Sequence, residues 1–171
     1  QAGMQPYKFS KFDTEKEKRY ETYKNILKDF TEYHHKMILS EDTSALKYLE
    51  KRGISKTTIL EFKLGYVPYN SQFYNVISKK FSDKEIAETG LFFKDEKRKR
   101  FVNRFNSRII FPIKNIVGDV IAFGGRIIKE GKYAKYINSP ETEFYKKGRH
   151  VFNLEKAKSF PKKNEEVLIV E

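Results

Sequence analysis

The sequence predicts an α+β fold, in which N-terminal helices are followed by a small antiparallel β-sheet. Three observations predict it. Between Thr14 and Gly90, apolar residues recur three and four positions apart behind helix-capping residues. From Phe101 the period changes to short β-rich runs separated by turns. The last residues, Val167–Val170, form an unbroken apolar run typical of a strand buried on both faces of a parallel sheet, so we expect this strand to open a neighbouring, truncated domain.

A long amphipathic helix is expected from Thr14, which forms a Thr-x-x-Glu capping box with Glu17, after an N-terminal tag remnant or flexible arm over residues 1–13. The apolar stripe of this helix consists of Tyr20, Tyr23, Leu27, Phe30, His34 and Met37. Neighbouring side chains on a helix point about 100° apart, so His34 and His35 are not expected to bind one metal ion as a pair.

Three shorter helices should each be bounded by a capping residue and a glycine stop. The expected pairs are Asp42 and Gly53, Ser55 and Gly65, and the Ser82/Glu85 capping box with Gly90. Two further short helices are expected, one over residues 73–79 and one that Asn153 would cap and that would end at Lys158.

The β-rich half begins with an expected antiparallel hairpin. Its strands are Arg108–Ile113 and Val120–Phe123, and its turn contains Gly118 and Asp119. Proline cannot donate a ladder hydrogen bond, so Pro112 should lie at an edge or a bulge. A third extended segment is expected over Tyr133–Ile137.

The composition indicates a folded, basic protein. The 171 residues include 35 Lys and Arg against 23 Asp and Glu, a net charge of +12, and 15 Phe with 11 Tyr supply enough apolar surface for a core. With no Cys, disulfides, thiolate zinc sites and cysteine nucleophiles are excluded. No apolar run is long enough for a spanning helix or a signal peptide, so we expect a soluble, cytoplasmic protein with no membrane partner. Its charge favours a polyanionic partner, most often nucleic acid.

The excess positive charge is concentrated between Lys94 and Arg149, a segment that contains 15 Lys and Arg but only 6 Asp and Glu. The run 97–100 is equally compatible with a solvated loop. The later cations alternate instead with glycines and aromatic residues, which is the composition of a groove that follows phosphates: Arg126, Lys135, Lys146, Lys147 and Arg149.

Two short motifs fall within this basic region. Gly124-Gly125-Arg126 closes the second strand of the hairpin and indicates a bulge or, as the alternative, a close approach of another backbone. It has neither the Rossmann nor the P-loop spacing. The segment Asn138–Thr142 is typical of a turn that leads into a helix cap.

Several motifs occur together in one order: Arg108-Ile-Ile-Phe-Pro-Ile, Ile121-Ala-Phe-Gly-Gly-Arg126, Lys135-Tyr-Ile-Asn-Ser-Pro-Glu-Thr142 and Lys147-Gly-Arg149. Together they closely resemble the catalytic core of the bacterial DnaG-type primases. The upstream strings Tyr48–Ile54 and Phe62–Tyr66 look like that family's helical approach, and Glu166–Glu171 looks like the opening strand of its Toprim domain. The resemblance extends over residues 14–171.

The resemblance implies a fragment of a DNA primase, a nucleotidyltransferase that synthesises short RNA primers for DNA replication. Residues 14–163 would be the basic N-terminal subdomain of its RNA polymerase core, and residues 164–171 the start of a truncated Toprim domain. In the family, a zinc ribbon precedes this core and a C-terminal domain engages the replicative helicase. This sequence lacks the zinc ribbon and the helicase-binding domain, and its Toprim domain is cut at the first acid. The resemblance therefore implies that the fragment alone is inactive.

The resemblance also assigns site residues. Single-stranded DNA template or an RNA–DNA hybrid would be held by its phosphates on Arg52, Arg108, Arg126, Lys135 and Lys147, with Arg104 and Arg149 as neighbours. The groove would be shaped by Gly124, Gly125, Asn138, Ser139, Pro140, Glu141 and Thr142. Glu171 matches the first Toprim acid and would be catalytic. Mg²⁺ or Mn²⁺ and NTPs would bind the complete core, whereas this fragment offers no metal ligand beyond Glu171 and should hold no ion tightly.

Two other classes remain compatible with the residues. One is a basic nucleic-acid-binding module without catalysis, and the other is a protein-interaction or ribosome-associated adaptor that seeks an acidic partner. The continuation beyond Glu171 would discriminate among them, because an Asp-x-Asp motif there indicates the polymerase.

Overall fold

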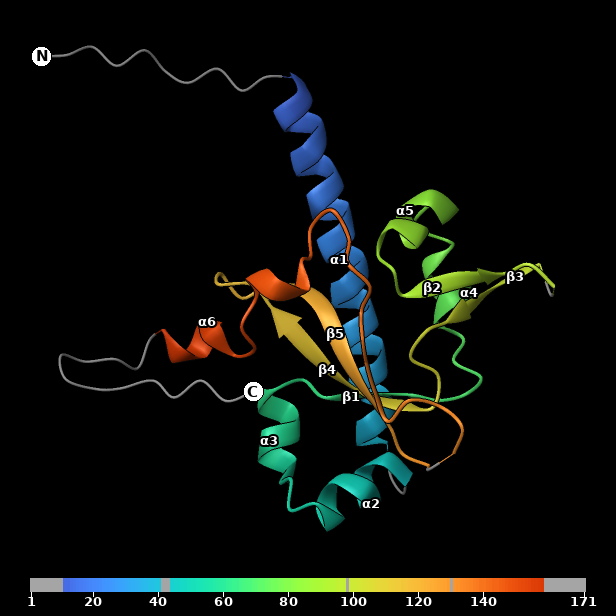
Figure 1. The fold of residues 1–171 in the computed structure, drawn as a ribbon, viewed down its shortest axis with the longest axis vertical. Helices are drawn as coiled ribbons and strands as arrows, with labels where there is room; N and C mark the ends of the chain where they lie inside the picture. The colour runs from blue at the N-terminus through green and yellow to red at the C-terminus, as the bar shows by residue number, and fades with distance from the viewer. Residues whose placement is uncertain (1–10, 41–43, 98, 130, 159–171) are drawn as a thin grey trace, which may run out of the picture.

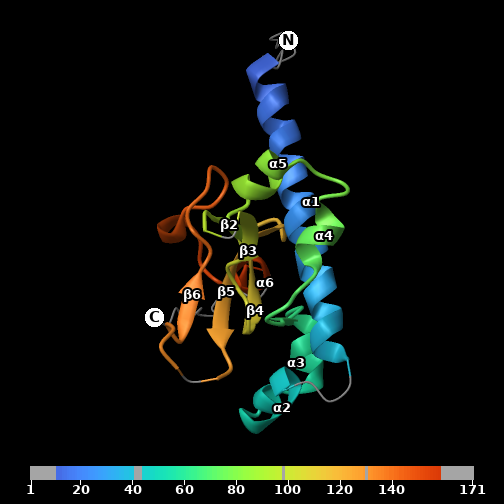
Figure 2. The ribbon, with the colours of Figure 1, turned by 90° about the vertical axis from the view of Figure 1, so that its right-hand side faces the viewer.

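The computed structural model describes residues 11–40, 44–97, 99–129 and 131–158. A long helix, α1, runs along one side of a four-stranded sheet (Figure 1). Of the short helices, α2 and α3 lie at one end of the molecule, α4 and α5 lie beside α1, and α6 lies at the opposite side. Figure 2 shows the same arrangement from the side, with α1 along one face of the sheet and α2 and α3 below it. The fold is therefore the predicted α+β arrangement. Among the described residues, no helix has the length and apolar character needed to cross a membrane.

The first helix, α1 (Lys11–Leu39), begins three residues before its expected cap, so Thr14 lies inside it and the predicted capping box is wrong. The predicted apolar stripe is confirmed in its central part, because Tyr23, Leu27, Phe30 and His34 are all buried. Rings from distant elements surround Phe30, with centroids 5.2 Å away for Phe73, 6.3 Å for Phe105 and 4.9 Å for Phe123. These aromatic contacts connect α1 to the sheet, through Phe123, and to two segments outside it, through Phe73 and Phe105.

The next helices are α2 (Ser44–Lys51) and α3 (Lys56–Glu61). The stop at Gly53 is confirmed by its φ of +76°, and Ser55 caps α3 by accepting a hydrogen bond from the Thr58 amide. The expected cap at Asp42 lies outside the described residues.

The predicted stop at Gly65 is wrong, because Lys63 takes the left-handed conformation and Gly65 opens a strand, β1 (Gly65–Val67). A Cβ at Gly65 would lie 3.0 Å from the His34 backbone. The glycine thus allows β1 to approach α1 closely.

Two short helices follow, α4 (Phe73–Ile77) and α5 (Asp83–Glu88). Both were expected, and the Ser82/Glu85 capping box is present in both directions. Gly90 has the expected positive φ of +68°.

The main sheet is antiparallel, with the order β1-β4-β5-β6. The expected hairpin is confirmed as β4 (Arg108–Lys114) and β5 (Val120–Ile127), and the third extended segment as β6 (Tyr136–Asn138). Pro112 lies opposite Phe123, whose N–H and C=O both bond to Ser139 instead. The other side of β4 is locally an edge at this point, because β1 pairs no further than Ile110. Pro112 therefore costs the sheet no hydrogen bond.

The expected bulge at Gly124 and Gly125 is wrong, because the register between β4 and β5 is continuous there. The irregularity lies instead between Ile113 and Lys114. A Cβ on Gly125 would lie 2.5 Å from Cδ1 of Phe105. Glycine is needed here because an aromatic ring packs directly on the strand.

A second, two-stranded sheet was not expected. It consists of β2 (Phe92–Asp95) and β3 (Arg100–Asn103). Of the basic run, Lys97 and Lys99 lie in its turn and Arg100 begins β3. The hairpin projects away from α1 (Figure 1).

The last described helix is α6 (Leu154–Ala157), at the predicted place. Its N-cap residue, Asn153, adopts a left-handed conformation with a φ of +65°, and its side chain makes no capping hydrogen bond. The expected side-chain cap is therefore wrong. The predicted strand 167–170, like most of the N-terminal arm, lies outside the described residues.

Candidate nucleic-acid interface

Arg126 lies between two tyrosines at the end of β5. Its Nε donates to the Tyr48 hydroxyl and its Nη1 to the Tyr136 hydroxyl, and its Cζ is 5.2 Å and 4.7 Å from the two ring centroids. Arg52 joins the group, with its Cζ 5.6 Å from the Tyr48 ring. We call these four residues the Arg126 cluster. It brings α2, β5 and β6 together through one guanidinium.

Two predicted cations, Arg52 and Arg126, thus meet on Tyr48, a residue that sequence reasoning did not assign to the site. Tyr136 was not assigned either, although it directly follows Lys135. The sequence feature that could have identified both tyrosines is their position within a basic motif. Arg126 is 8% exposed and Tyr136 is 61% exposed, so the arginine is held beneath a ring that faces solvent. Lys135 is also exposed.

Arg108 lies below this surface. It is buried, and its guanidinium donates to the carbonyl oxygens of Ala134, at 2.9 Å, and Lys135, at 3.3 Å. Burial lowers its pKa from the ordinary arginine value. These bonds fix the segment that leads into β6 and presents Lys135. A contact between Arg108 and phosphate remains a prediction.

The segment 138–142 leaves the sheet and crosses toward α1. Ser139 continues the pairing, since its N–H donates to the Phe123 carbonyl and its Oγ accepts from the Phe123 N–H. Pro140 packs on Gly90, where a Cβ would lie 2.5 Å from the proline Cγ. Thr142 Oγ1 accepts backbone hydrogen bonds from residues 144 and 145 and lies 3.1 Å from the Tyr23 hydroxyl. The expected turn into a helix cap is wrong, because residues 139–142 form neither a turn nor a helix and the next helical element begins only at Lys147.

The last two predicted cations lie on a 3-10 turn, η1 (Lys147–Arg149), and both are exposed. Glu141 holds this turn in place, because its Oε1 accepts the Lys147 N–H at 3.1 Å and its other oxygen lies 3.4 Å from Lys146 Nζ. Asn138 lies at the other end of the segment, opposite Gly124. The predicted groove residues 138–142 therefore connect the Arg126 cluster with η1.

Arg104 lies apart from the cluster, at the base of the β2–β3 hairpin. Its Nε donates to the Gly90 carbonyl oxygen at 3.1 Å. It lines a cleft together with Pro140 and Thr142 of the segment and with Arg19 of α1. The segment 138–142 thus passes close to Arg104 on its way to η1.

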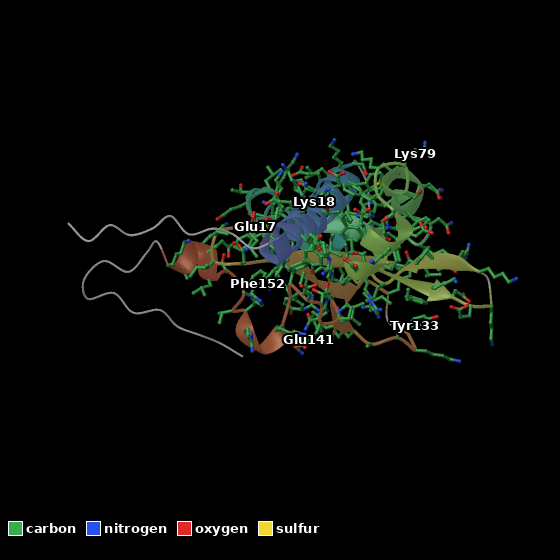
Figure 3. All side chains as sticks on the ribbon, turned by 90° about the horizontal axis from the view of Figure 1, so that it is seen from above. Glu17, Lys18, Lys79, Tyr133, Glu141 and Phe152 are labelled. Carbon is green, nitrogen blue, oxygen red and sulfur yellow. The ribbon has the colours of Figure 1, made fainter. Side chains whose placement is uncertain are left out.

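In Figure 3, which views the molecule from above, Tyr133 and Glu141 lie on one side of the molecule and Lys79 lies on the other. Within the described residues, no three His, Asp or Glu side chains gather closely enough to hold a metal ion. Glu171, the predicted catalytic acid, lies outside them.

Comparisons with known proteins agree with this fold. The family profile "DNA primase catalytic core, N-terminal domain" matches residues 32–158. A DNA primase of Staphylococcus epidermidis is 38% identical over 149 residues, which cover 85% of this chain and 24% of the relative. A DnaG primase catalytic domain bound to single-stranded DNA matches 82% of this chain and 44% of its own, with 30% identity and a TM-score of 0.72. The Aquifex aeolicus primase, with zinc-binding and RNA polymerase domains, matches 83% and 35%, with 31% identity and a TM-score of 0.75.

Fold and sequence together define the class of the chain as a catalytic-core domain of α+β architecture. The chain belongs to the DNA primase family and corresponds to the N-terminal domain of the catalytic core. It spans about a quarter of the length of the Staphylococcus relative.

Proposed function

We propose that this chain is the part of a bacterial DNA primase that holds single-stranded template DNA, or the RNA–DNA hybrid, for primer synthesis. The observation that carries the proposal is that the segment 138–142, fixed by Ser139, Glu141 and Thr142, connects the Arg126 cluster and the exposed Lys135 with the exposed Lys147 and Arg149. A DnaG relative bound to single-stranded DNA supports the choice of ligand. The whole protein would work in the bacterial cytoplasm with NTPs and the replicative helicase.

The exposed cations would bind phosphates rather than read bases. Lysine and arginine contacts to phosphate carry no sequence information directly, and they make the affinity fall steeply with salt. Arg126 has fewer free donors, because two of its nitrogens already bond to tyrosine hydroxyls. Its orientation is thereby set before the nucleic acid arrives.

Catalysis would need acids from beyond this chain. Glu171 would be the first of them, and Mg²⁺ or Mn²⁺ held by Glu171 and downstream carboxylates would neutralise the triphosphate. A zinc ribbon would precede the core in the complete protein. Mg²⁺-dependent primer synthesis by a chain extended beyond Glu171 tests this assignment. An extended chain that binds DNA without making primers would favour the module without catalysis.

We expect Lys135→Ala and Lys147→Ala each to weaken binding of single-stranded DNA roughly fivefold to tenfold at about 0.1 M salt, because each removes about one phosphate contact. The slope of log affinity against log salt should flatten by about one in each variant. Fluorescence anisotropy with labelled oligonucleotides at several salt concentrations measures both quantities.

Lys79→Ala is the matched control, since Lys79 is also an exposed lysine but lies on the opposite side of the molecule (Figure 3). Loss of affinity in the Lys79 variant equal to that in the other two would reduce the effect to net charge and remove Lys135 and Lys147 from the site.

A further inference from the structure

The β2–β3 hairpin presents one aromatic ring to solvent. Cross-strand pairing places Phe92 and Asn103 on one face of the hairpin, and Phe93 and Val102 on the other. The first face packs inward, where the ring centroid of Phe92 lies 5.4 Å from that of Tyr74 in α4. Phe93, on the second face, keeps 45% of its surface exposed. The hairpin thus has a covered face and an open face that carries a phenyl ring.

An arginine lies beside this ring. The guanidinium carbon of Arg104 lies 5.7 Å from the centroid of Phe93, and the hydrogen bond from Nε to the Gly90 carbonyl fixes the side chain there. Four more cations of the hairpin are exposed: Lys94, Lys97, Lys99 and Arg100. Only two acids, Asp95 and Glu96, occur within 92–104. Because side chains alternate along a strand, Arg100 and Asp95 share the open face with Phe93, Lys94 lies on the covered face, and Lys97 and Lys99 lie in the turn. The open face and the turn together therefore combine an aromatic ring with more cations than acids.

Acids in the neighbouring cleft do not cancel this charge, because other cations bind them. Arg19 lies 3.4 Å from Glu88 and 2.7 Å from Glu143, and Lys146 lies 3.4 Å from Glu141. Arg104 contributes to the same cleft as Pro140 and Thr142. The hairpin site is thus adjacent to the segment 138–142 but separate from the Arg126 cluster.

We propose that Phe93 and Arg104 form a stacking site for an unpaired base of single-stranded nucleic acid, with the hairpin cations binding the adjacent phosphates. An exposed ring beside an arginine offers a π-face to any base, while lysines and arginines follow the backbone. In a duplex the faces of the bases are already stacked on one another, so single strands should be preferred. This inference rests on the proposed function and extends the path of the strand beyond the segment 138–142.

The first experiment uses the absence of tryptophan from the sequence. In Phe93→Trp, the introduced indole is the only tryptophan, and its fluorescence should be quenched when oligo-dT binds, because a stacked base lies against it. The matched control is Phe152→Trp. Phe152 is 50% exposed and lies at the opposite side of the molecule from the hairpin (Figure 3). Quenching in the Phe93 variant alone supports the site, and equal quenching or none in both variants overturns it.

The second experiment measures affinity by anisotropy. Phe93→Ala should weaken oligo-dT binding roughly fivefold or more without changing the salt slope, since a stacking contact is lost but no phosphate contact. Phe152→Ala should bind like the wild type. A strand of abasic phosphodiester units should bind the wild type and Phe93→Ala equally. A weakening of the same size on the abasic strand would show that the ring acts only on the fold.

The two proposals fail in different ways. If the wild-type chain binds no single-stranded DNA, both are overturned. If the wild type binds and the Lys135 and Lys147 variants lose affinity, while Phe93→Ala binds normally and Phe93→Trp is not quenched, only the stacking site is overturned.

Discussion

Replacing Arg126 by alanine is expected to weaken binding of single-stranded DNA by about ten- to a hundredfold, the range for losing hydrogen bonds to a charged group. The loss should exceed that of any single exposed lysine for two reasons. The variant removes a cation, and it also removes the group that holds Tyr48 and Tyr136 in their present positions. Anisotropy titrations at a fixed salt concentration measure the effect.

Arg126→Lys separates the two causes. A lysine keeps the charge but cannot donate to both tyrosine hydroxyls in the fixed geometry of a guanidinium, so its affinity should lie between those of the wild type and Arg126→Ala. Because Arg126 is largely buried, thermal unfolding of each variant must accompany the titration. Wild-type affinity in a folded Arg126→Ala chain would remove this arginine from the interface.

Lowering the pH from about 6.5 to about 4 is expected to cost the fold roughly 3 kcal/mol through His34 alone, at about 1.4 kcal/mol per pKa unit. Burial lowers the pKa of His34 to about 4 from its ordinary value of 6.5, against a smaller opposite effect of the Phe30 carbonyl. The folded state thus takes up the proton less readily than the unfolded chain. The stability is fully present above pH 6.5 and is lost as the pH falls to about 4.

The surroundings of His34 explain this direction. Its Nδ1–H donates to the Phe30 carbonyl at 2.9 Å, its Nε2 accepts from Ser71 Oγ at 2.8 Å, and the rings of Phe30, Tyr33 and Phe73 face it. None of these groups carries a charge that would stabilise an imidazolium.

Urea unfolding at several pH values measures the effect. His34→Gln should lose the part of the pH dependence that lies between 6.5 and 4, whereas His150→Gln should keep it. Should the glutamine variant not fold, NMR titration of the wild-type imidazole still decides the matter, because a His34 pKa near 6.5 would contradict the prediction.

Local rules predicted the helices well. Caps such as Ser55 and the Ser82/Glu85 box depend on a few neighbouring residues, which the sequence displays directly. The sequence did not predict the strand Gly65–Val67, because this strand is short and its glycine allows a close contact with His34, a residue distant in the sequence. The β2–β3 hairpin was not predicted either, because its charged turn is typical of a solvated loop. Its two strands are held by the packing of Phe92 and Phe101 on Tyr74 of α4, which the local sequence does not display.

For the candidate site, the sequence identified the types of residue but not their arrangement. Charge and spacing pointed to Arg108 and Arg126 alike. Both are buried, and only their partners separate them, because Arg108 bonds to carbonyls 26 and 27 residues away, while Arg126 bonds to a tyrosine from α2. Such pairings depend on how β4, β5 and β6 align, and no local pattern encodes this. The role of Tyr48 was hidden for the same reason.

The hydrogen bonds that hold residues 138–142 in place affect the entropy of nucleic-acid binding. Ser139 is bonded to β5 at one end and Thr142 lies against Tyr23 at the other, so this backbone is rigid before any ligand arrives. A strand laid along it would lose its own conformational entropy, but the protein would lose little. The segment 138–142 is therefore preorganised for binding, and most of the conformational entropy lost on association is lost by the nucleic acid.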